Sequence, residues 1–126
     1  MLLLCLVACF AALPAQAQNE AIYQYKGPDR EAKLLEGAKK EGTLLLYTSM
    51  APTESNQLAQ AFEKKYGIKV QVWRNLSETV LQRAIAEARA RRHSVDVIET
   101  SAPEVEVLVQ ENLVSEFHSP LSLIHI

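Results

Sequence analysis

The stretch EGTLLLYTS, residues 41–49, decides the fold, because it places an apolar strand between a glycine and a loop of hydroxyl residues. Residues 43–47 contain three consecutive leucines, and a strand that is apolar on both sides is typical of a sheet covered on both faces. Gly42 suits the end of a preceding helix, and the polar residues that follow suit a loop opening the next helix. We therefore predict a buried strand at Thr43–Thr48.

Strand and helix patterns alternate along the rest of the chain. Two more strands are predicted at residues 68–74 and 95–100, the first alternating as expected near a sheet edge. Helices are predicted at residues 29–41, from Pro52 to Gly67, after Ser77 as N-cap, and after Ser101, whose spacing from Glu104 is that of a capping box. Short connections and long helices between strands imply parallel strands and right-handed crossovers. The predicted fold class is α/β, with three layers: a parallel sheet and helices on both faces.

The first residues of the chain are predicted to be a secretory leader. Residues 1–13 form an apolar run that is too short to span a membrane and about right for a signal-peptide core. The small-x-small pattern at residues 15–17 predicts cleavage before Gln18, so that residues 1–17 are a signal peptide and the mature protein is periplasmic. A second interpretation remains open, in which residues 6–9 form a lipoprotein box that ends at Cys9 and anchors the protein to lipid.

The last six residues, LSLIHI at positions 121–126, resemble the translated transposon end that serves as an adapter in DNA library preparation. We expect them to be an adapter-derived scar and the natural chain to continue beyond Pro120, although an ordinary apolar tail is the alternative. Residues 18–120 then remain, which is enough for one small domain but not for two lobes.

Composition excludes several classes of protein. Lys and Arg number 13 against 15 Asp and Glu, a net charge of -2 with no basic stripe, so no nucleic-acid partner is expected. The basic cluster at residues 89–93 sits at a predicted helix end, where cations complement the dipole. The mature segment has no cysteine, G-x-S-x-G, H-E-x-x-H, P-loop or G-x-G-x-x-G pattern, so no enzyme is expected and no catalytic residues are assigned.

Three blocks carry a resemblance to a known family: residues 41–49, residues 61–74 (AFEKKYGIKVQVWR) and residues 80–100 (VLQRAIAEARARRHSVDVIET). In this order they resemble the first lobe of type 2 extracytoplasmic solute-binding proteins of ABC importers, and most of all the ferric-iron-binding branch. The resemblance covers residues 29–120. It implies a full-length monomer with two α/β lobes around a ligand cleft, of which this chain is about the first third. It also implies a membrane permease as partner, and no cofactor other than Fe(III) as a transported ligand.

Ligands of open α/β sheets gather at the carboxyl ends of the strands, where loops and helix amino termini converge. The predicted ligand-binding residues lie at three such ends: Thr48 and Ser49; Arg74, Asn75 and Ser77; Thr100 and Ser101. Their hydroxyls, the backbone amides and the helix ends favour an anionic group, and Arg74 could clamp it with two hydrogen bonds. Of their neighbours, Tyr47 is expected to pack beneath the loop and Glu99 to pair with a nearby base.

The identity of the solute stays open between Fe(III) and organic anions, phosphonates, sulfonates or polyamine-like compounds. The loop at residues 49–55 has no histidine, and His93 and His118 lack ligand spacing, so no closed metal site is expected in this segment and its metal ligands are unknown. Two other functions remain alternatives, namely a ligand-sensing receptor ectodomain and, less favoured, a secreted α/β enzyme.

Overall fold

A computed structural model of the chain describes residues 22–117 and 119. The predicted signal peptide, the alternative lipoprotein box and the terminal scar lie outside the described residues. The chain divides into two compact units, one of residues 27–115 and one that joins residues 1–26 to residues 116–126. In the described part of the second unit, Gln24 Nε2 donates a hydrogen bond of 3.1 Å to the carbonyl of Glu116.

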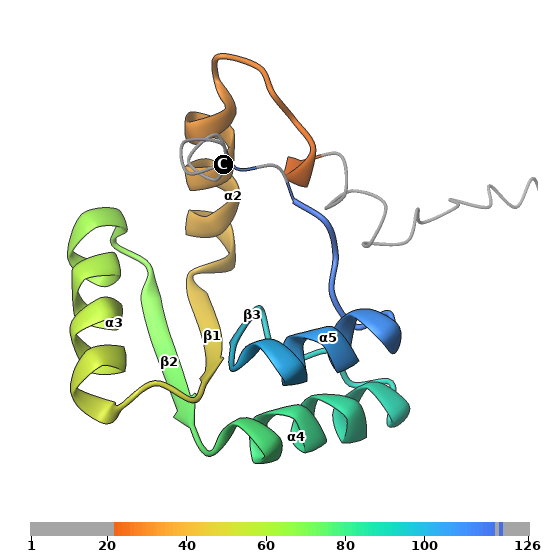
Figure 1. Cartoon of the computed structure of the whole chain (residues 1–126). Coiled ribbons are helices and arrows are strands. Elements are labelled where there is room, and N and C mark those ends of the chain that lie inside the picture. Colours follow the sequence, from red (N-terminus) through yellow and green to blue (C-terminus); the bar gives the residue numbers. More distant parts are fainter. Residues whose placement is uncertain (1–21, 118, 120–126) are drawn as a thin grey trace, which may run out of the picture. The chain divides into compact units, whose positions relative to one another are not determined.

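The unit of residues 27–115 alternates helices and strands along its whole length (Figure 1). In chain order the elements are α2 (Arg30–Glu41), β1 (Thr43–Thr48), α3 (Pro52–Tyr66), β2 (Lys69–Arg74), α4 (Ser77–Arg89), β3 (Val97–Glu99) and α5 (Ala102–Gln110). No helix among the described residues is long and apolar enough to cross a membrane.

The three strands form one parallel sheet in the order β2-β1-β3. The strand predicted at Thr43–Thr48 is confirmed with the same bounds, and it lies in the centre, where its last three residues are buried. Its continuous apolar run suits this place, because a central strand meets helices on both sides. β2 lies at one edge of the described sheet, and its alternating exposure confirms the edge position predicted from its alternating sequence.

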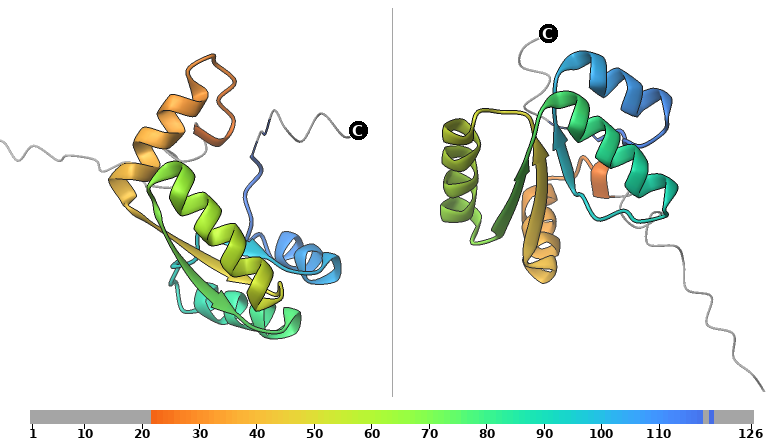
Figure 2. Two further views of the ribbon diagram at one scale, coloured as in Figure 1. Left: turned by 90° about the vertical axis from the view of Figure 1, so that its left-hand side faces the viewer. Right: turned by 90° about the horizontal axis from the view of Figure 1, so that it is seen from below.

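Helices cover both faces of the sheet. α3 packs on β2, whereas α4 contacts β1 and packs against α5. Figure 2 shows α3 on one face and α4 with α5 on the other. This agrees with the strand order, because β1 to β2 and β2 to β3 run in opposite directions across the sheet, and crossovers of the usual right hand then place their helices on opposite faces. The predicted α/β class with a parallel open sheet is confirmed.

Two glycines end their helices as the sequence predicts. Gly42 and Gly67 have φ values of 77° and 71°, a left-handed conformation that costs a residue with a Cβ but not glycine. The Gly42 amide donates to the carbonyl of Ala38 at 2.9 Å, and the Gly67 amide to that of Glu63 at 2.8 Å. Pro52 opens α3 as predicted, where its missing amide hydrogen leaves no bond unmade.

The predicted capping of α4 is wrong. The N-cap of α4 is Leu76, which is extended, and Ser77 is already the first helical residue. Ser101 does precede α5, but its hydroxyl donates to the Glu104 carboxylate and makes no bond to a backbone amide, so the predicted capping box is not formed. In both cases the sequence shows a serine at the start of a helix, but the backbone conformation determines which group, if any, the serine hydroxyl bonds to.

Three element bounds also differ from the prediction, and the first is the start of β2, which lies at Lys69 and not at Ile68. β3 spans only Val97–Glu99, within the predicted residues 95–100, because Asp96 replaces regular pairing with a side-chain bond. Its Oδ2 accepts from the Leu45 amide at 2.7 Å while its own amide donates to the Leu45 carbonyl at 3.1 Å. The first helix begins at Arg30, with Asp29 as its N-cap residue.

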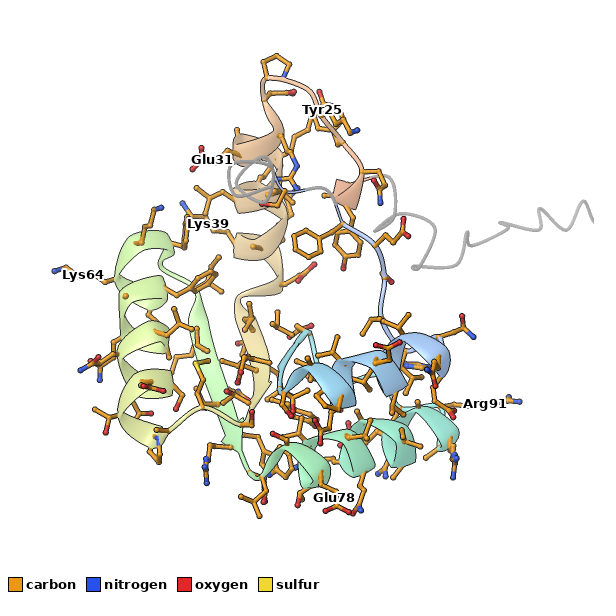
Figure 3. The ribbon with its side chains drawn as sticks, viewed as in Figure 1. Tyr25, Glu31, Lys39, Lys64, Glu78 and Arg91 are labelled. Atoms are coloured by element: carbon orange, nitrogen blue, oxygen red, sulfur yellow. The ribbon has the colours of Figure 1, made fainter. Side chains whose placement is uncertain are left out.

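The core is small and lies between the sheet and its helices. Tyr47 and Val80 are completely buried, and Leu108 is 1% exposed. Other apolar side chains remain open to solvent, including Leu76 at 66% and Val109 at 55%. Charged residues lie on the outside and, on α4, follow the helix dipole: Figure 3 shows Glu78 and Arg91 near opposite ends of this helix, the acid at the amino end.

Candidate functional site

The carboxyl end of the sheet brings three polar residues into one row. Arg74 of β2, Thr48 of β1 and Glu99 of β3 are register partners on adjacent strands. Register partners point to the same face of a sheet, so the three side chains share one face, with the hydroxyl between the two charges. Tyr47, one residue before Thr48, points to the opposite face, where it meets Arg83 of α4.

Glu99 organises the loop that follows β1. Its Oε2 accepts from the Thr48 hydroxyl, from the Ser49 amide at 3.1 Å and from the Met50 amide at 3.2 Å. Thr48 is completely buried, and its Oγ1 also accepts from the Met50 amide at 3.0 Å. The expectation that Glu99 pairs with a nearby base is wrong for the described residues, because Glu99 forms no ion pair with any of them and accepts from backbone and hydroxyl donors instead.

The contacts of Glu99 change how the predicted anion site is interpreted, because its donors already have an acceptor. The Thr48 hydroxyl and the Ser49 amide were expected to face an anionic ligand, and they do face an anion, but it is the chain's own carboxylate. The donors of this loop are therefore occupied. The second oxygen of Glu99, Oε1, makes no hydrogen bond to any described residue, so the row presents a carboxylate oxygen at this position.

Arg74 approaches the same loop from the other side. Its Nε donates to the carbonyl of Met50 at 3.1 Å, and the side chain is exposed. This one bond orients the guanidinium, while its two terminal nitrogens make no hydrogen bond or ion pair with the described residues. An oriented guanidinium with free donors is the group that binds carboxylates and phosphates with two parallel bonds.

The other predicted site residues lie around this row without joining it. The Asn75 amide donates to the Thr48 carbonyl at 3.1 Å, and its Oδ1 accepts from the Leu76 amide at 2.9 Å, so Asn75 supports the loop. Ser77 opens α4, and its hydroxyl bonds to no described residue. The Thr100 hydroxyl oxygen is buried and has no partner among the described residues. The Ser101 hydroxyl is taken by Glu104.

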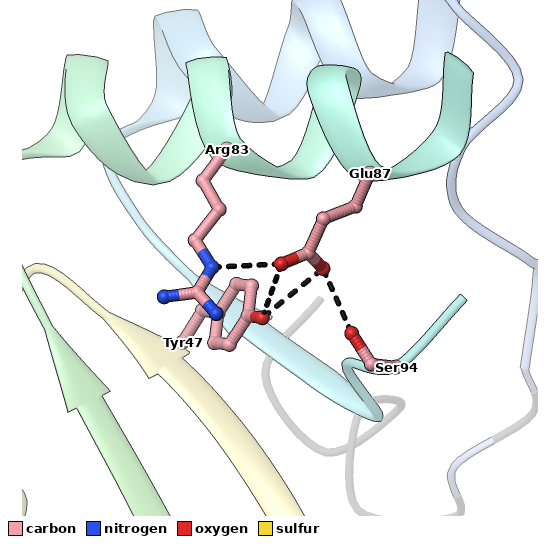
Figure 4. A network of polar contacts seen from close by, with 4 residues as sticks. All are labelled: Tyr47, Arg83, Glu87 and Ser94. Atoms are coloured by element: carbon pink, nitrogen blue, oxygen red, sulfur yellow. Dashed lines mark hydrogen bonds and ion pairs between the residues drawn. The ribbon is translucent and has the colours of Figure 1, made fainter. Parts of the chain in front are cut away.

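A second polar cluster lies on the opposite face, beneath α4 (Figure 4). The hydroxyl of Tyr47 bonds to both oxygens of the Glu87 carboxylate, at 2.9 and 3.1 Å. Arg83 Nε donates to Glu87 at 2.8 Å, and the Ser94 hydroxyl donates to it at 2.9 Å. The Arg83 guanidinium also stacks over the rings of Tyr47 and Trp73, 4.6 and 4.3 Å from their centroids. These contacts fasten α4 and the loop after it to the sheet.

Ionisation of this cluster is set by its neighbours. Partial burial of Glu87 raises its pKa, but hydrogen bonds from Arg83, Ser94 and Tyr47 outweigh burial and hold the pKa below its ordinary value. The hydrogen bond to Glu87 raises the pKa of Arg83. The cluster therefore holds a carboxylate and a guanidinium at neutral pH. The expectation for Tyr47 is refined: it is buried, but on the α4 face, with its hydroxyl on Glu87.

The described residues provide no complete set of ligands for a metal ion. Among residues 22–117 and 119, no three His, Cys, Asp or Glu side chains gather closely enough to hold a metal ion. Of the row at the strand ends, only Glu99 is an anionic donor. A metal bound at this edge would need further ligands from elsewhere or an accompanying anion.

No family model, curated protein or solved structure matches the chain. The contacts and charges at the strand ends are therefore the features of this chain that bear on its function.

Two parts of this geometry were beyond the sequence analysis. Glu99 was recognised as lying at a strand end, but its role as the acceptor for the β1 loop depends on the register between β1 and β3. The Arg83 and Glu87 pair is visible as an i, i+4 pair on a helix, whereas its link to Tyr47 crosses 40 residues. The sequence signal for it was a tyrosine at the buried end of an otherwise leucine-rich strand.

Proposed function

We propose that this chain is the first-lobe segment of an extracytoplasmic solute-binding protein that delivers a small ligand to an ABC importer in the inner membrane. The observation that carries the proposal is the row Arg74, Thr48 and Glu99 at the carboxyl end of the sheet. Polar groups from all three strands meet there, on the edge where open α/β sheets bind ligands. The Thr48 hydroxyl does meet the Glu99 carboxylate, but Thr48 is completely buried, so this hydroxyl is not offered to a substrate as a nucleophile, which favours binding over catalysis.

The proposed mechanism is capture by closure. The solute docks on the loops of this lobe, a second lobe encoded beyond residue 120 closes over it, and the closed form is read by the permease. The free donors of Arg74 and the free hydroxyl of Ser77, which is not used as a helix cap, are the groups offered to an anionic part of the ligand. Fe(III) remains in this proposal as a ligand that arrives with an anion or is held mainly by the second lobe.

The test begins with the native locus. Sequencing across the junction at Pro120 should reveal a reading frame about twice as long again, and a stop codon directly after Ile126 would refute the proposal. The full product is then screened by thermal shift and calorimetry against Fe(III)-citrate, dicarboxylates, phosphonates, sulfonates and polyamines. At least one class should raise the melting temperature in a concentration-dependent way.

A paired variant locates the site within that protein. Changing Arg74 and Ser77 together to alanine should weaken binding at least tenfold, because both groups are free at the strand ends. Arg91→Ala is the matched control, since Arg91 is an exposed arginine in the loop after α4. Unchanged affinity in the double variant would show that the ligand binds elsewhere.

A further inference from the structure

We propose that the ligand of this site carries both an anionic and a cationic group, the anion bound by Arg74 and the cation by Glu99. The inference rests on the proposed solute-binding function and narrows its ligand class. It replaces a purely anionic ligand with a bipolar one, such as a short ω-amino acid or an amino-phosphonate.

The first step is that the two charges are held apart. Both side chains bond to Met50, Arg74 to its carbonyl oxygen and Glu99 to its amide nitrogen. They form no ion pair with each other, although they share one face and one register row. Adjacent strands lie about 4.8 Å apart, so the two Cα atoms are separated by roughly 10 Å across β1. The loop backbone thus keeps a guanidinium and a carboxylate from neutralising one another.

The second step is that each charge keeps unused bonding capacity. The two terminal nitrogens of Arg74 and the Oε1 of Glu99 make no hydrogen bond to the described residues. The donors that would compensate Glu99, namely the Thr48 hydroxyl and the amides of Ser49 and Met50, all go to Oε2. A ligand therefore meets donors at one end of the row and an acceptor at the other.

The third step concerns what each simpler ligand would face. A dianion that reached Arg74 would approach the Glu99 carboxylate without any free amide to offset the repulsion. A polyamine that reached Glu99 would likewise approach the Arg74 guanidinium. A bipolar ligand satisfies both ends at once, and repulsion at either end acts against the singly charged competitors.

The test uses the product of the native reading frame and a matched set of probes. Calorimetry compares 4-aminobutyrate with butyrate and butylamine, and a series from glycine to 6-aminohexanoate varies the distance between the two charges. Some member of the series should bind at least tenfold more tightly than both singly charged analogues of its own length. Fe(III)-citrate and dicarboxylates are titrated in parallel.

Two variants then assign the ends. Arg74→Gln should remove the advantage over the amine, and Glu99→Gln should remove the advantage over the carboxylate, while Arg91→Gln and Glu106→Gln leave both unchanged. Trp73 fluorescence during thermal melting verifies that each variant is folded. Arg74 is exposed and makes only one hydrogen bond, so its variant remains informative even if Glu99→Gln unfolds.

The outcomes separate this inference from the broader proposal. Binding of Fe(III)-citrate or of a singly charged anion that is as tight as that of every bipolar probe would overturn the inference and leave the solute-binding function standing. Binding of none of these probes would overturn the inference, and the solute-binding function falls with it only if the phosphonates, sulfonates and polyamines of the broader screen also fail to bind. Preference for a bipolar probe that survives in both variants would also overturn it, because the charges would then be read by other residues.

Discussion

The hydrogen bond between Tyr47 and Glu87 should be one of the larger single contributions to the stability of the unit of residues 27–115. Tyr47 is completely buried, and its hydroxyl has the Glu87 carboxylate as its partner. The change Glu87→Ala leaves this buried hydroxyl without a partner, at a cost of about 1–3 kcal/mol. It also removes the i, i+4 pair with Arg83, worth about 0.5 kcal/mol, and the better helix propensity of alanine returns a similar amount.

The expected net loss in the free energy of unfolding is therefore about 2 kcal/mol. In a Tyr47→Phe background no hydroxyl is left unpaired and the two smaller contributions cancel, so the same Glu87→Ala change should cost no more than about 0.5 kcal/mol. The difference is a coupling energy of about 2 kcal/mol between the two residues, which a double-mutant cycle measures directly. Glu106→Ala is the control, because Glu106 is exposed and should change stability by no more than about 0.5 kcal/mol.

The chain carries its own probe for this measurement. Trp73 is its only tryptophan, and its ring lies 4.9 Å from that of Tyr47 and beneath the Arg83 guanidinium. Urea unfolding followed by tryptophan fluorescence therefore reports on the cluster itself. A coupling energy within error of zero, with both single variants folded, would refute the view that the Tyr47 hydroxyl depends on Glu87.

Four further predictions follow from the described contacts. The pKa of Glu87 lies below its ordinary value of 4.5, so the stabilising effect of the Glu87 carboxylate is present above about pH 4.5 and is lost as the pH falls through the pKa of Glu87 in the folded protein. The difference in unfolding free energy between the unchanged chain and the Glu87→Ala variant should therefore shrink from pH 7 to pH 3. Gly67→Ala should lower the free energy of urea unfolding by about 1 kcal/mol, because φ is 71° at this position. Gly37→Ala lies inside α2 with nothing within 4 Å of the added methyl group, so it should raise that free energy by about 0.5–1 kcal/mol. Changes of the same sign in the two variants would contradict this reasoning. The 126-residue chain should self-associate in sedimentation velocity, and Val97→Lys with Val109→Lys should reduce association, because these side chains are 44% and 55% exposed on β3 and α5; a monomer at all concentrations would be the contrary result. Under the proposed capture between two lobes, the same chain by itself should bind the solute of the full protein at least a hundredfold more weakly in calorimetry, and equal affinity would rule out that mechanism.

The strands could be predicted from the sequence because their signals are local. The leucines before Tyr47 mark a strand buried on both faces, and the structure places that strand in the middle of the sheet. Gly42 and Gly67 mark helix ends because only glycine adopts a left-handed turn without cost, and both do so. The error in the prediction for Ser77 has an equally local cause. Serine is common at N-caps, but the backbone of Ser77 is already helical here.

The site could be predicted only in part, because its contacts connect distant segments. Strand ends and hydroxyl residues were readable, and Thr48, Ser49 and Arg74 do gather around one loop. The sequence did not predict which carboxylate accepts hydrogen bonds from the amides of that loop. This depends on the strand register, which places Glu99 beside Thr48. A difference of one residue in that register would turn Glu99 to the opposite face of the sheet.

The strand order β2-β1-β3 has a consequence for the timing of folding. The strand that leaves the ribosome first is the one that must be flanked on both sides, so β1 cannot complete its backbone pairing until Glu99 has also emerged. Until then three leucines and a tyrosine remain exposed, and partly synthesised chains present an apolar segment that can bind chaperones or other chains. For a protein proposed to be extracytoplasmic, this delay is useful, because the chain remains unfolded, and so open to export, until nearly a hundred residues are available to fold together.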